Sequence, residues 1–226
     1  MEDRYARNAG VLDEADQEAL RRKTAAVVGL GGLGGHIAEQ LARLGVGRLI
    51  LADGDTVAVS NLNRQIFATE ETLGWRKTDA AQDRLRRVNG QTECVVFSEY
   101  LTGENSARLL AGADIALDAA DTARARLTLE RCCAELGLPL VHGAVGGFLG
   151  EVCFISPGDG TLAKLYANAA DLDAACADGC PAFMPAAAAS IQVAEAVKYL
   201  LGRPGLLRRR LLRFNLLTHE YETLAV

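Results

Sequence analysis

The residues best suited to chemistry in this sequence are glycines that follow a short apolar run. Gly29, Gly31 and Gly34 have the spacing G-x-G-x-x-G. The apolar run Ala25 to Val28 predicts a buried strand before them, and apolar residues at helical spacing over 36–44 predict a helix after them. Such glycines allow a tight turn, a close approach of backbone to a phosphate and close helix–strand packing. The helix N-terminus adds N–H groups and a positive dipole end, so the pattern predicts a nucleotide site.

An acidic residue stands where a ribose-binding carboxylate is expected. A second apolar strand is expected over Arg48 to Ala52, and Asp53 follows it, 22 residues after Gly31. A carboxylate about 20 residues beyond the glycines holds a ribose hydroxyl in dinucleotide-binding folds. Strand, glycines, helix, strand and acid in this order are more specific than the glycines alone. The alternative is a tight strand-to-helix turn without a ligand.

Polar residues are dense in the segment 53–79, which follows the second strand. It carries Arg64 and Lys77, with Asn61 and Asn63 between the strand and the second cation. Loops at the carboxyl ends of parallel strands form ligand sites, so this segment is the expected wall of the site. Two cations suit a triphosphate better than a nicotinamide, because they neutralise charge as pyrophosphate leaves. The alternative is a pair of solvated surface cations.

A further carboxylate is expected at the same edge of the sheet. The predicted strand Ile115 to Ala119 delivers Asp118 and Asp121 to its carboxyl end. Asp121 could hold Mg²⁺, which takes one or two carboxylates together with phosphate oxygens. Asp121 could instead cap the helix expected from Thr122 to Leu136, and the two roles are compatible.

The remaining elements must place these groups together. Strands and helices alternate, so we predict an α/β fold, Rossmann-like, with a mainly parallel sheet flanked by helices and extra C-terminal strands. We expect a single ATP-binding domain over 1–226, with an N-terminal arm at 1–22 that packs on a neighbour and a mobile crossover loop at about 157–185. The other expected strands are 93–97, 139–142, 151–156, 210–215 and 221–225, and the other expected helices are 78–88, 106–110 and 186–201.

Composition and charge argue against several classes of protein, including nucleic-acid-binding, membrane-spanning and disulfide-rich proteins. The chain has 226 residues, 50% of them hydrophobic, and a net charge of −5, which argues against a nucleic-acid partner. No apolar stretch reaches the ~18–20 residues that span a bilayer, and no signal peptide is visible, so we expect a cytoplasmic protein without a membrane partner. The six cysteines have neither disulfide-scaffold nor C-x-x-C spacing, so reduced thiols and no zinc are expected.

These residues together resemble a known family. The chain is similar to the HesA/MoeB/ThiF adenylyltransferases, the relatives of ubiquitin-activating enzymes, over nearly its whole length. The most specific part is SNLNRQ at 60–65, following GLGGLG at 29–34. The other segments that carry the resemblance are RYAR at 4–7, DGD at 53–55, GWRK at 74–77, DAAD at 118–121, HGA at 142–144 and the late helix 192–202.

The resemblance implies ATP with Mg²⁺ and a ubiquitin-like sulfur-carrier protein that ends in Gly-Gly. Its C-terminal glycine carboxylate, ionised at neutral pH without a general base, would attack the α-phosphate and give an acyl-adenylate and pyrophosphate. Asp53 would hold the ribose, Asp121 the Mg²⁺, and Arg7 would act as an arginine finger across a homodimer interface. The implied nucleotide-binding residues are Gly29, Gly31, Gly32, Gly34, Asp53, Asp55, Asn61, Arg64, Gln65 and Lys77, of which Arg64 and Lys77 would hold the phosphates.

Two departures from the family pattern concern the site. Thr122 stands where the family has asparagine after the metal-binding aspartate, and the paired C-x-x-C motifs of many members are absent. Many relatives use a cysteine after adenylation, and Cys176 matches its place best, with Cys180 second. A loop thiol near a helix N-terminus can be nucleophilic, whereas the neighbouring acids would raise its pKa, so a catalytic and an inert Cys176 both stay open. We expect His142 and the remaining cysteines to be structural.

Three other functions stay open on the sequence. Within the family, the substrate carboxylate could belong to a modified tRNA base. From other classes, the chain could be an NAD-dependent oxidoreductase, which would bind NADH without Mg²⁺. It could also be an inert scaffold gated by nucleotide.

Overall fold

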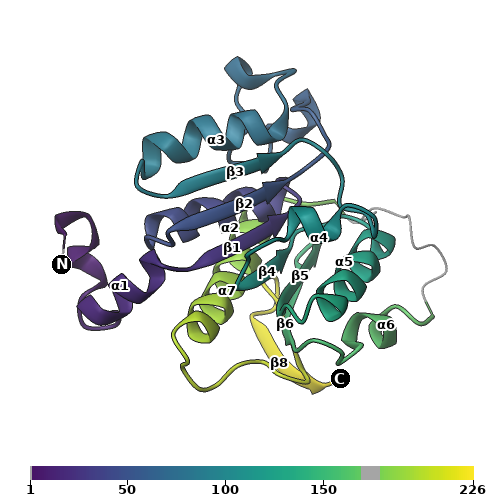
Figure 1. Cartoon of the computed structure of the whole chain (residues 1–226). Helices are drawn as coiled ribbons and strands as arrows, with labels where there is room; N and C mark the ends of the chain where they lie inside the picture. The colour runs from purple at the N-terminus through teal and green to yellow at the C-terminus, as the bar shows by residue number, and fades with distance from the viewer. Residues whose placement is uncertain (1, 169–178) are drawn as a thin grey trace.

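The computed structural model describes residues 2–168 and 179–226, and in this part of the chain an eight-stranded sheet carries the fold (Figure 1). The strand order is β3-β2-β1-β4-β5-β6-β7-β8. The first five strands of this order pair in parallel, and β6, β7 and β8 are added antiparallel. The strand bounds are β1 Thr24–Val28, β2 Arg48–Ala52, β3 Glu93–Phe97, β4 Ile115–Asp118, β5 Leu140–Gly146, β6 Leu149–Ile155, β7 Arg210–Asn215 and β8 Glu220–Ala225. The α/β class, the parallel sheet and the extra C-terminal strands are therefore confirmed.

Helices cover both faces of the sheet, and the core is accordingly in two parts. Residues of β1 alternate between them: Ala25 and Val27 pack with α2, α3 and α7, whereas Ala26 and Val28 pack with α5 and α6. This alternation is the two-residue period of a strand buried on both faces. The helix bounds are α1 Glu14–Arg21, α2 Gly32–Arg43, α3 Lys77–Val88, α4 Ser106–Leu109, α5 Ala123–Glu135, α6 Thr161–Leu165 and α7 Phe183–Leu200, and the 3-10 helices are Asp3–Asn8, Val59–Asn61 and Glu70–Thr72.

Several predicted boundaries were wrong, and glycine and proline account for most of the differences. Helix α2 begins at Gly32 rather than at 36. Its first turn consists largely of glycines, which were predicted to lie in the preceding loop. Helix α7 begins at Phe183 rather than at 186, with Pro185 in the first turn, where a missing N–H costs nothing. Strands β5 and β6 extend through glycines into a hairpin that pairs Gly146 with Leu149. The loop predicted at about 157–185 contains the short helix α6.

The N-terminal segment packs on the chain's own amino-terminal sheet edge. Tyr5 is buried, and its hydroxyl accepts a hydrogen bond from Asn89 Nδ2 at 2.9 Å. Asn89 ends α3 just before β3, and Gly45, which the Tyr5 ring also approaches, precedes β2. Arg7 is exposed in the same segment, which Figure 1 shows beside the tails of the first strands. The arm is thus anchored in its own chain, whatever neighbour it meets.

Among the described residues, no helix combines the length and the apolar character that crossing a lipid bilayer requires.

Candidate functional site

The glycine loop lies at the point where the sheet order turns from β2 to β4. Gly29 follows β1 with φ +92°, and a Cβ placed on it would lie 2.5 Å from the carbonyl oxygen of Ala119, which follows β4. Gly34 packs against Gly29: a Cβ placed on Gly34 would lie 1.8 Å from the Gly29 carbonyl oxygen. Gly31, the residue before α2, would meet only Gln65 Nε2, at 3.6 Å, and no side chain caps the helix there. Ligands of such folds bind at this reversal of strand order, above an open helix N-terminus.

Asp53 is directly joined to the glycine loop. Its carboxylate is 7% exposed and accepts hydrogen bonds from the main-chain N–H of Leu30 at 2.6 Å and of Asp55 at 2.8 Å. Burial raises the pKa of Asp53, against the opposing effects of Lys77 and of the two N–H groups. The acid at the end of β2 is therefore fixed beside the loop, as a ribose-binding group requires.

Lys77 lies against the two acids that follow β2. Main-chain pairing of Lys77 N with Asp55 O at 3.0 Å brings the start of α3 next to residue 55. The buried Lys77 ammonium is 2.8 Å from Asp55 Oδ2 and 3.8 Å from Asp53 Oδ2. Burial alone would raise the pKa of Asp55, but hydrogen bonds from Lys77 and Tyr100 outweigh it, so this pKa is lowered. The cation predicted for the phosphates is thus present, and a carboxylate pairs with it in this structure.

The segment 60–65 folds over the glycine loop. Arg64 Nη1 donates to Ser60 O and to Asn63 Oδ1, both at 2.8 Å, and its Cγ would lie 3.7 Å from a Cβ at Gly32. Gln65 is buried beside Gly31. The Asn61 side-chain oxygen is used locally, since it accepts from Ala58 N at 3.0 Å. Arg64 and Gln65 are therefore at the glycines, whereas Asn61 holds the shape of its own turn.

Asp121 reaches the same edge from β4, but it is not the helix cap. That role belongs to Thr122, whose Oγ1 accepts from Ala125 N at 3.2 Å at the start of α5, so the capping alternative for Asp121 was wrong. Asp121 is exposed. Its charge acts on Tyr100: the hydrogen bond to Asp55, burial, and the charges of Asp55, Asp53 and Asp121, in that order, raise the pKa of Tyr100 to about 12.

Three side chains near this edge were not predicted from the sequence. Tyr100 lies over Gly54, where a Cβ would meet its ring at 2.6 Å, and its hydroxyl donates to Asp55. Arg126 from α5 and Gln192 from α7 donate to the main-chain oxygens of Ala120 and Asp118. The position of Tyr100 just after a predicted strand could have indicated a site residue. Nothing in the sequence distinguishes Arg126 and Gln192 from other helix residues.

Of the two remaining predicted sites, the cysteine and the arginine finger, only the arginine finger is placed apart from these residues within one chain. Cys176 lies outside the described residues. The carbonyl oxygen of Cys180 accepts from Asn63 Nδ2 at 3.3 Å, which places residue 180 beside the segment 60–65. Cys132, Cys133 and Cys153 are buried, as expected for structural residues, and burial raises the pKa of the Cys133 thiol to about 12. Arg7 lies with the N-terminal segment at the opposite, amino-terminal edge of the sheet.

The donors at this edge suit a magnesium nucleotide. Uncapped N–H groups of α2 and the cations Arg64 and Lys77 match phosphates, and Asp53 matches a ribose hydroxyl. Within residues 2–168 and 179–226, no three His, Cys, Asp or Glu side chains are grouped to hold a metal ion. Mg²⁺ does not require such a group, because one or two carboxylates with phosphate oxygens and water complete its shell. The expectation of no zinc stays a prediction.

Known proteins resemble this chain over most of its length. The SAMP-activating enzyme E1 of Haloferax volcanii is 32% identical over 98% of this chain and 84% of its own. The sulfur carrier protein adenylyltransferase of Thermus thermophilus is 35% identical over 93% and 81%. The crystal structure of Escherichia coli tRNA N6-threonylcarbamoyladenosine dehydratase in complex with ATP superposes with a TM-score of 0.75 at 25% identity, covering 88% and 94%.

The pattern of the ThiF family matches residues 5–226. The fold, the ATP-complexed neighbour and the adenylyltransferases among the relatives define a class of nucleotide-binding α/β proteins. Within this class, the chain belongs to the ThiF family.

Proposed function

We propose that the chain is an ATP-dependent adenylyltransferase whose substrate is the C-terminal glycine carboxylate of a ubiquitin-like sulfur carrier, of the kind used in thiamine or molybdopterin synthesis. The observation that carries the proposal is the convergence of one glycine loop, one buried acid, two cations and one exposed acid at the carboxyl edge of the sheet. Two relatives, a SAMP-activating enzyme and a sulfur carrier protein adenylyltransferase, support the choice of partner.

Each residue has a task in this reaction. ATP supplies the adenylyl group and the pyrophosphate leaving group, and an ionised glycine carboxylate supplies the attacking oxygen. The glycine loop and α2 N-terminus bind phosphate oxygens, and Asp53 orients the ribose. Arg64 and Lys77 neutralise the charge that grows on the bridging oxygen as its bond to the α-phosphorus breaks. Asp121 would hold Mg²⁺, which would neutralise phosphate charge. Because the attacking carboxylate is already ionised, the protein contributes position and charge rather than a general base.

Arg7 is part of the proposal only as a residue supplied by a second copy of the chain. Within one chain it lies at the sheet edge opposite to Lys77 and Asp53, on a segment anchored there by the buried Tyr5. It cannot reach its own glycine loop without leaving that anchor. A homodimer that brings the arm of one subunit to the phosphates of the other is the arrangement in which Arg7 acts.

The similarity to the tRNA N6-threonylcarbamoyladenosine dehydratase supports one alternative substrate, a carboxylate on a tRNA base. The net charge of −5 favours the protein carrier over RNA. Transfer through Cys176 after adenylation, and a cytoplasmic location, stay predictions.

The first test is calorimetric binding of ATP with Mg²⁺, compared with NADH, on the wild-type chain and on Asp121→Asn. We expect the wild type to bind Mg–ATP, and Asp121→Asn to weaken that binding by about tenfold or more, because a metal-ligand oxygen is replaced by an uncharged amide. Glu222→Gln on the exposed strand β8 removes one acid elsewhere and should change nothing.

Two results would contradict the proposal. Binding of NADH with indifference to Mg²⁺ would indicate an oxidoreductase. Binding of Mg–ATP without pyrophosphate exchange, in the presence of carriers that end in Gly-Gly, would indicate an inert scaffold or a different carboxylate.

A further inference from the structure

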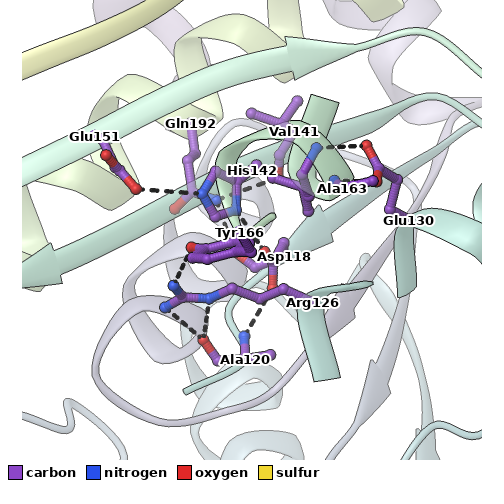
Figure 2. Close-up of polar contacts among 11 residues, drawn as sticks. Asp118, Ala120, Arg126, Glu130, Val141, His142, Glu151, Ala163, Tyr166 and Gln192 are labelled. Carbon is purple, nitrogen blue, oxygen red and sulfur yellow. Dashed lines mark hydrogen bonds and ion pairs between the residues drawn. The ribbon is translucent and has the colours of Figure 1, made fainter. Parts of the chain in front are cut away.

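A buried polar network contacts Asp118 and Ala120, the residues that lead into Asp121 (Figure 2). Asp118, the last residue of β4, has a fully buried side chain. Its Oδ1 accepts from the main-chain N–H of Ala120 at 2.9 Å, and its Oδ2 lies 2.6 Å from Nδ1 of His142. Gln192 Nε2 donates to the Asp118 carbonyl at 2.8 Å. Both carboxylate oxygens and the carbonyl oxygen of Asp118 are thus held by another element or by the turn.

His142 lies between two carboxylates. It is on β5 and fully buried, with Asp118 at Nδ1 and, from β6, Glu151 Oε1 at 3.8 Å from Nε2. Nε2 is buried and makes no hydrogen bond with the described residues. Nδ1 must carry a proton to donate to Asp118, and a bare Nε2 would turn its lone pair toward the Glu151 carboxylate. A second proton on Nε2 turns that repulsion into attraction.

Arg126 holds the same turn from α5. Its Nε and Nη2 donate to the carbonyl oxygen of Ala120 at 3.2 and 3.1 Å, and its Nη1 donates to the Tyr166 hydroxyl at 2.6 Å. The Tyr166 ring meets the His142 ring edge-on, with centroids 6.3 Å apart. Figure 2 shows the tyrosine ring between the imidazole and the guanidinium.

The network is balanced in charge when His142 is protonated. Asp118 on β4 and Glu151 on β6 are then matched by His142 on β5 and Arg126 on α5, and Arg213 on β7 also acts on Glu151. Burial and the nearby charge of Arg126 would lower the pKa of His142, but the hydrogen bond to Asp118 and the proximity of Glu151 outweigh them and raise it. A balanced set of this kind avoids the cost of an unpaired buried charge.

We propose that His142, through Asp118, is a positioning residue for Asp121, and that Arg126 completes the same clamp from α5. Asp118 accepts from the N–H of Ala120, and Arg126 donates to the carbonyl oxygen of Ala120. Both main-chain polar groups of the residue before Asp121 are therefore fixed. The direction in which the Asp121 carboxylate leaves the sheet edge follows from these bonds. The consequence for Mg–ATP rests on the proposed function, whereas the clamp itself does not.

The first measurement concerns the wild-type chain alone. The chain has three histidines, so ¹⁵N spectra of histidine-labelled protein resolve each ring, and a His142→Asn sample assigns His142 by loss of its signals. We expect both ring nitrogens of His142 to carry protons at pH 7.5. A neutral His142 ring at that pH would overturn the charge-balanced clamp.

The second measurement compares two variants that differ in one hydrogen bond. The amide nitrogen of Asn has nearly the place of the histidine Nδ1, so His142→Asn keeps a donor to Asp118, whereas His142→Leu has none. In His142→Leu we expect the Ala120 amide to exchange with deuterium about tenfold faster, and Mg–ATP affinity to fall about tenfold, with AMP affinity unchanged without Mg²⁺. His142→Asn keeps the hydrogen bond to Asp118 but not the positive charge, so its losses in both measurements should be clearly smaller than those of His142→Leu. His219→Asn, on the exposed β7–β8 turn, is the matched control.

The outcomes separate a positioning role from a merely structural one. Unchanged Ala120 exchange in a folded His142→Leu would overturn the clamp. Equal losses of Mg–ATP and of AMP binding, or no rescue by His142→Asn, would show general loosening and would also overturn it. If the wild type bound no nucleotide, the proposed function would fail, and the spectra and the exchange would still decide the clamp.

Discussion

Gly34 and Gly29 touch each other across the start of α2, and the contact leaves no room for a side chain. A Cβ on Gly34 would lie 1.8 Å from the Gly29 carbonyl oxygen and 3.2 Å from Ala119 Cβ. Both neighbours belong to the floor of the site, so neither can move without displacing β1 or β4. The requirement for glycine at 34 is therefore set by helix–strand packing and not by the ligand.

Gly34→Ala should destabilise the free protein, before any nucleotide is added. We expect the free energy of unfolding in urea to fall by about 2–4 kcal/mol, because the new methyl group meets backbone that cannot give way. Gly90→Ala is the control: its nearest contact is ordinary, at 3.5 Å from Arg86 O, so it should change the unfolding free energy by less than about 1 kcal/mol. A Gly34→Ala protein as stable as wild type would show that the loop is softer than the contact implies.

Sequence reasoning found the residues of the site whose chemistry is tied to a local motif. Gly29, Asp53 and Lys77 follow strands or begin a helix, and the structure brings them together. It did not find the contacts of His142, because the partners Asp118 and Glu151 are 24 and 9 residues away. Contacts between strands depend on sheet order and register, which no local spacing encodes.

Helices α2 and α3 are joined through one buried carboxylate. Glu39 on α2 accepts from Arg43 of its own helix at 2.7 Å and from Arg84 of α3 at 3.0 Å. Burial alone would raise the pKa of Glu39, but the hydrogen bonds and charges of these arginines outweigh it and lower it. The pKa of Glu39 is thus lower in the folded than in the unfolded protein. The ionised carboxylate therefore contributes its full stabilisation at pH values above the unfolded-state pKa, and this contribution is lost as the pH falls through the folded-state pKa.

Glu39→Gln should therefore cost stability in a pH-dependent way. At pH 7 we expect the free energy of unfolding to fall by about 1–2 kcal/mol, since charged hydrogen bonds are replaced by neutral ones. The difference from wild type should shrink as pH falls below about 4.5. Urea unfolding at pH 7 and pH 3.5 measures both, with the exposed Glu18→Gln, paired with Arg22, as a control expected to change little. A loss of equal size at both pH values would rule out the ion pair as its source.

The presence and type of each helix or strand were easier to predict than the residues at which it begins and ends. The strands Arg48–Ala52 and Glu93–Phe97 were confirmed to the residue, because each is a short apolar run that ends abruptly, although β3 at the sheet edge is only partly buried. The hairpin of β5 and β6 was underestimated, since its length depends on pairing between segments that are separately glycine-rich. The start of α7 was misplaced, since Phe183 and Pro185 give weak local signals.

Over the whole molecule, the N-terminal arm and the glycine loop lie at opposite edges of one parallel sheet. Within a chain this excludes Arg7 from the nucleotide site as long as Tyr5 stays buried. Complementation between two inactive variants decides whether a second subunit brings Arg7 there.

We expect Arg7→Ala and Lys77→Met to be inactive in pyrophosphate exchange when assayed separately. After mixing and subunit exchange, half of the dimers are mixed and each holds one intact site, so activity should return to about a quarter of wild type. Arg7→Ala mixed with itself is the control. An inactive mixture that nevertheless contains mixed dimers would show that Arg7 does not act across the interface.

The pairing of Lys77 with Asp55 has a consequence for how the protein responds to ionic strength. Lys77 pairs with the carboxylates of Asp53 and Asp55, and Arg64 and Asp121 lie at the same edge. When ionised, these two cations and three acids together carry one net negative charge. A nucleotide without Mg²⁺ then meets no excess of positive charge for salt to screen. Its binding should lack the steep decline with salt that marks purely basic phosphate sites.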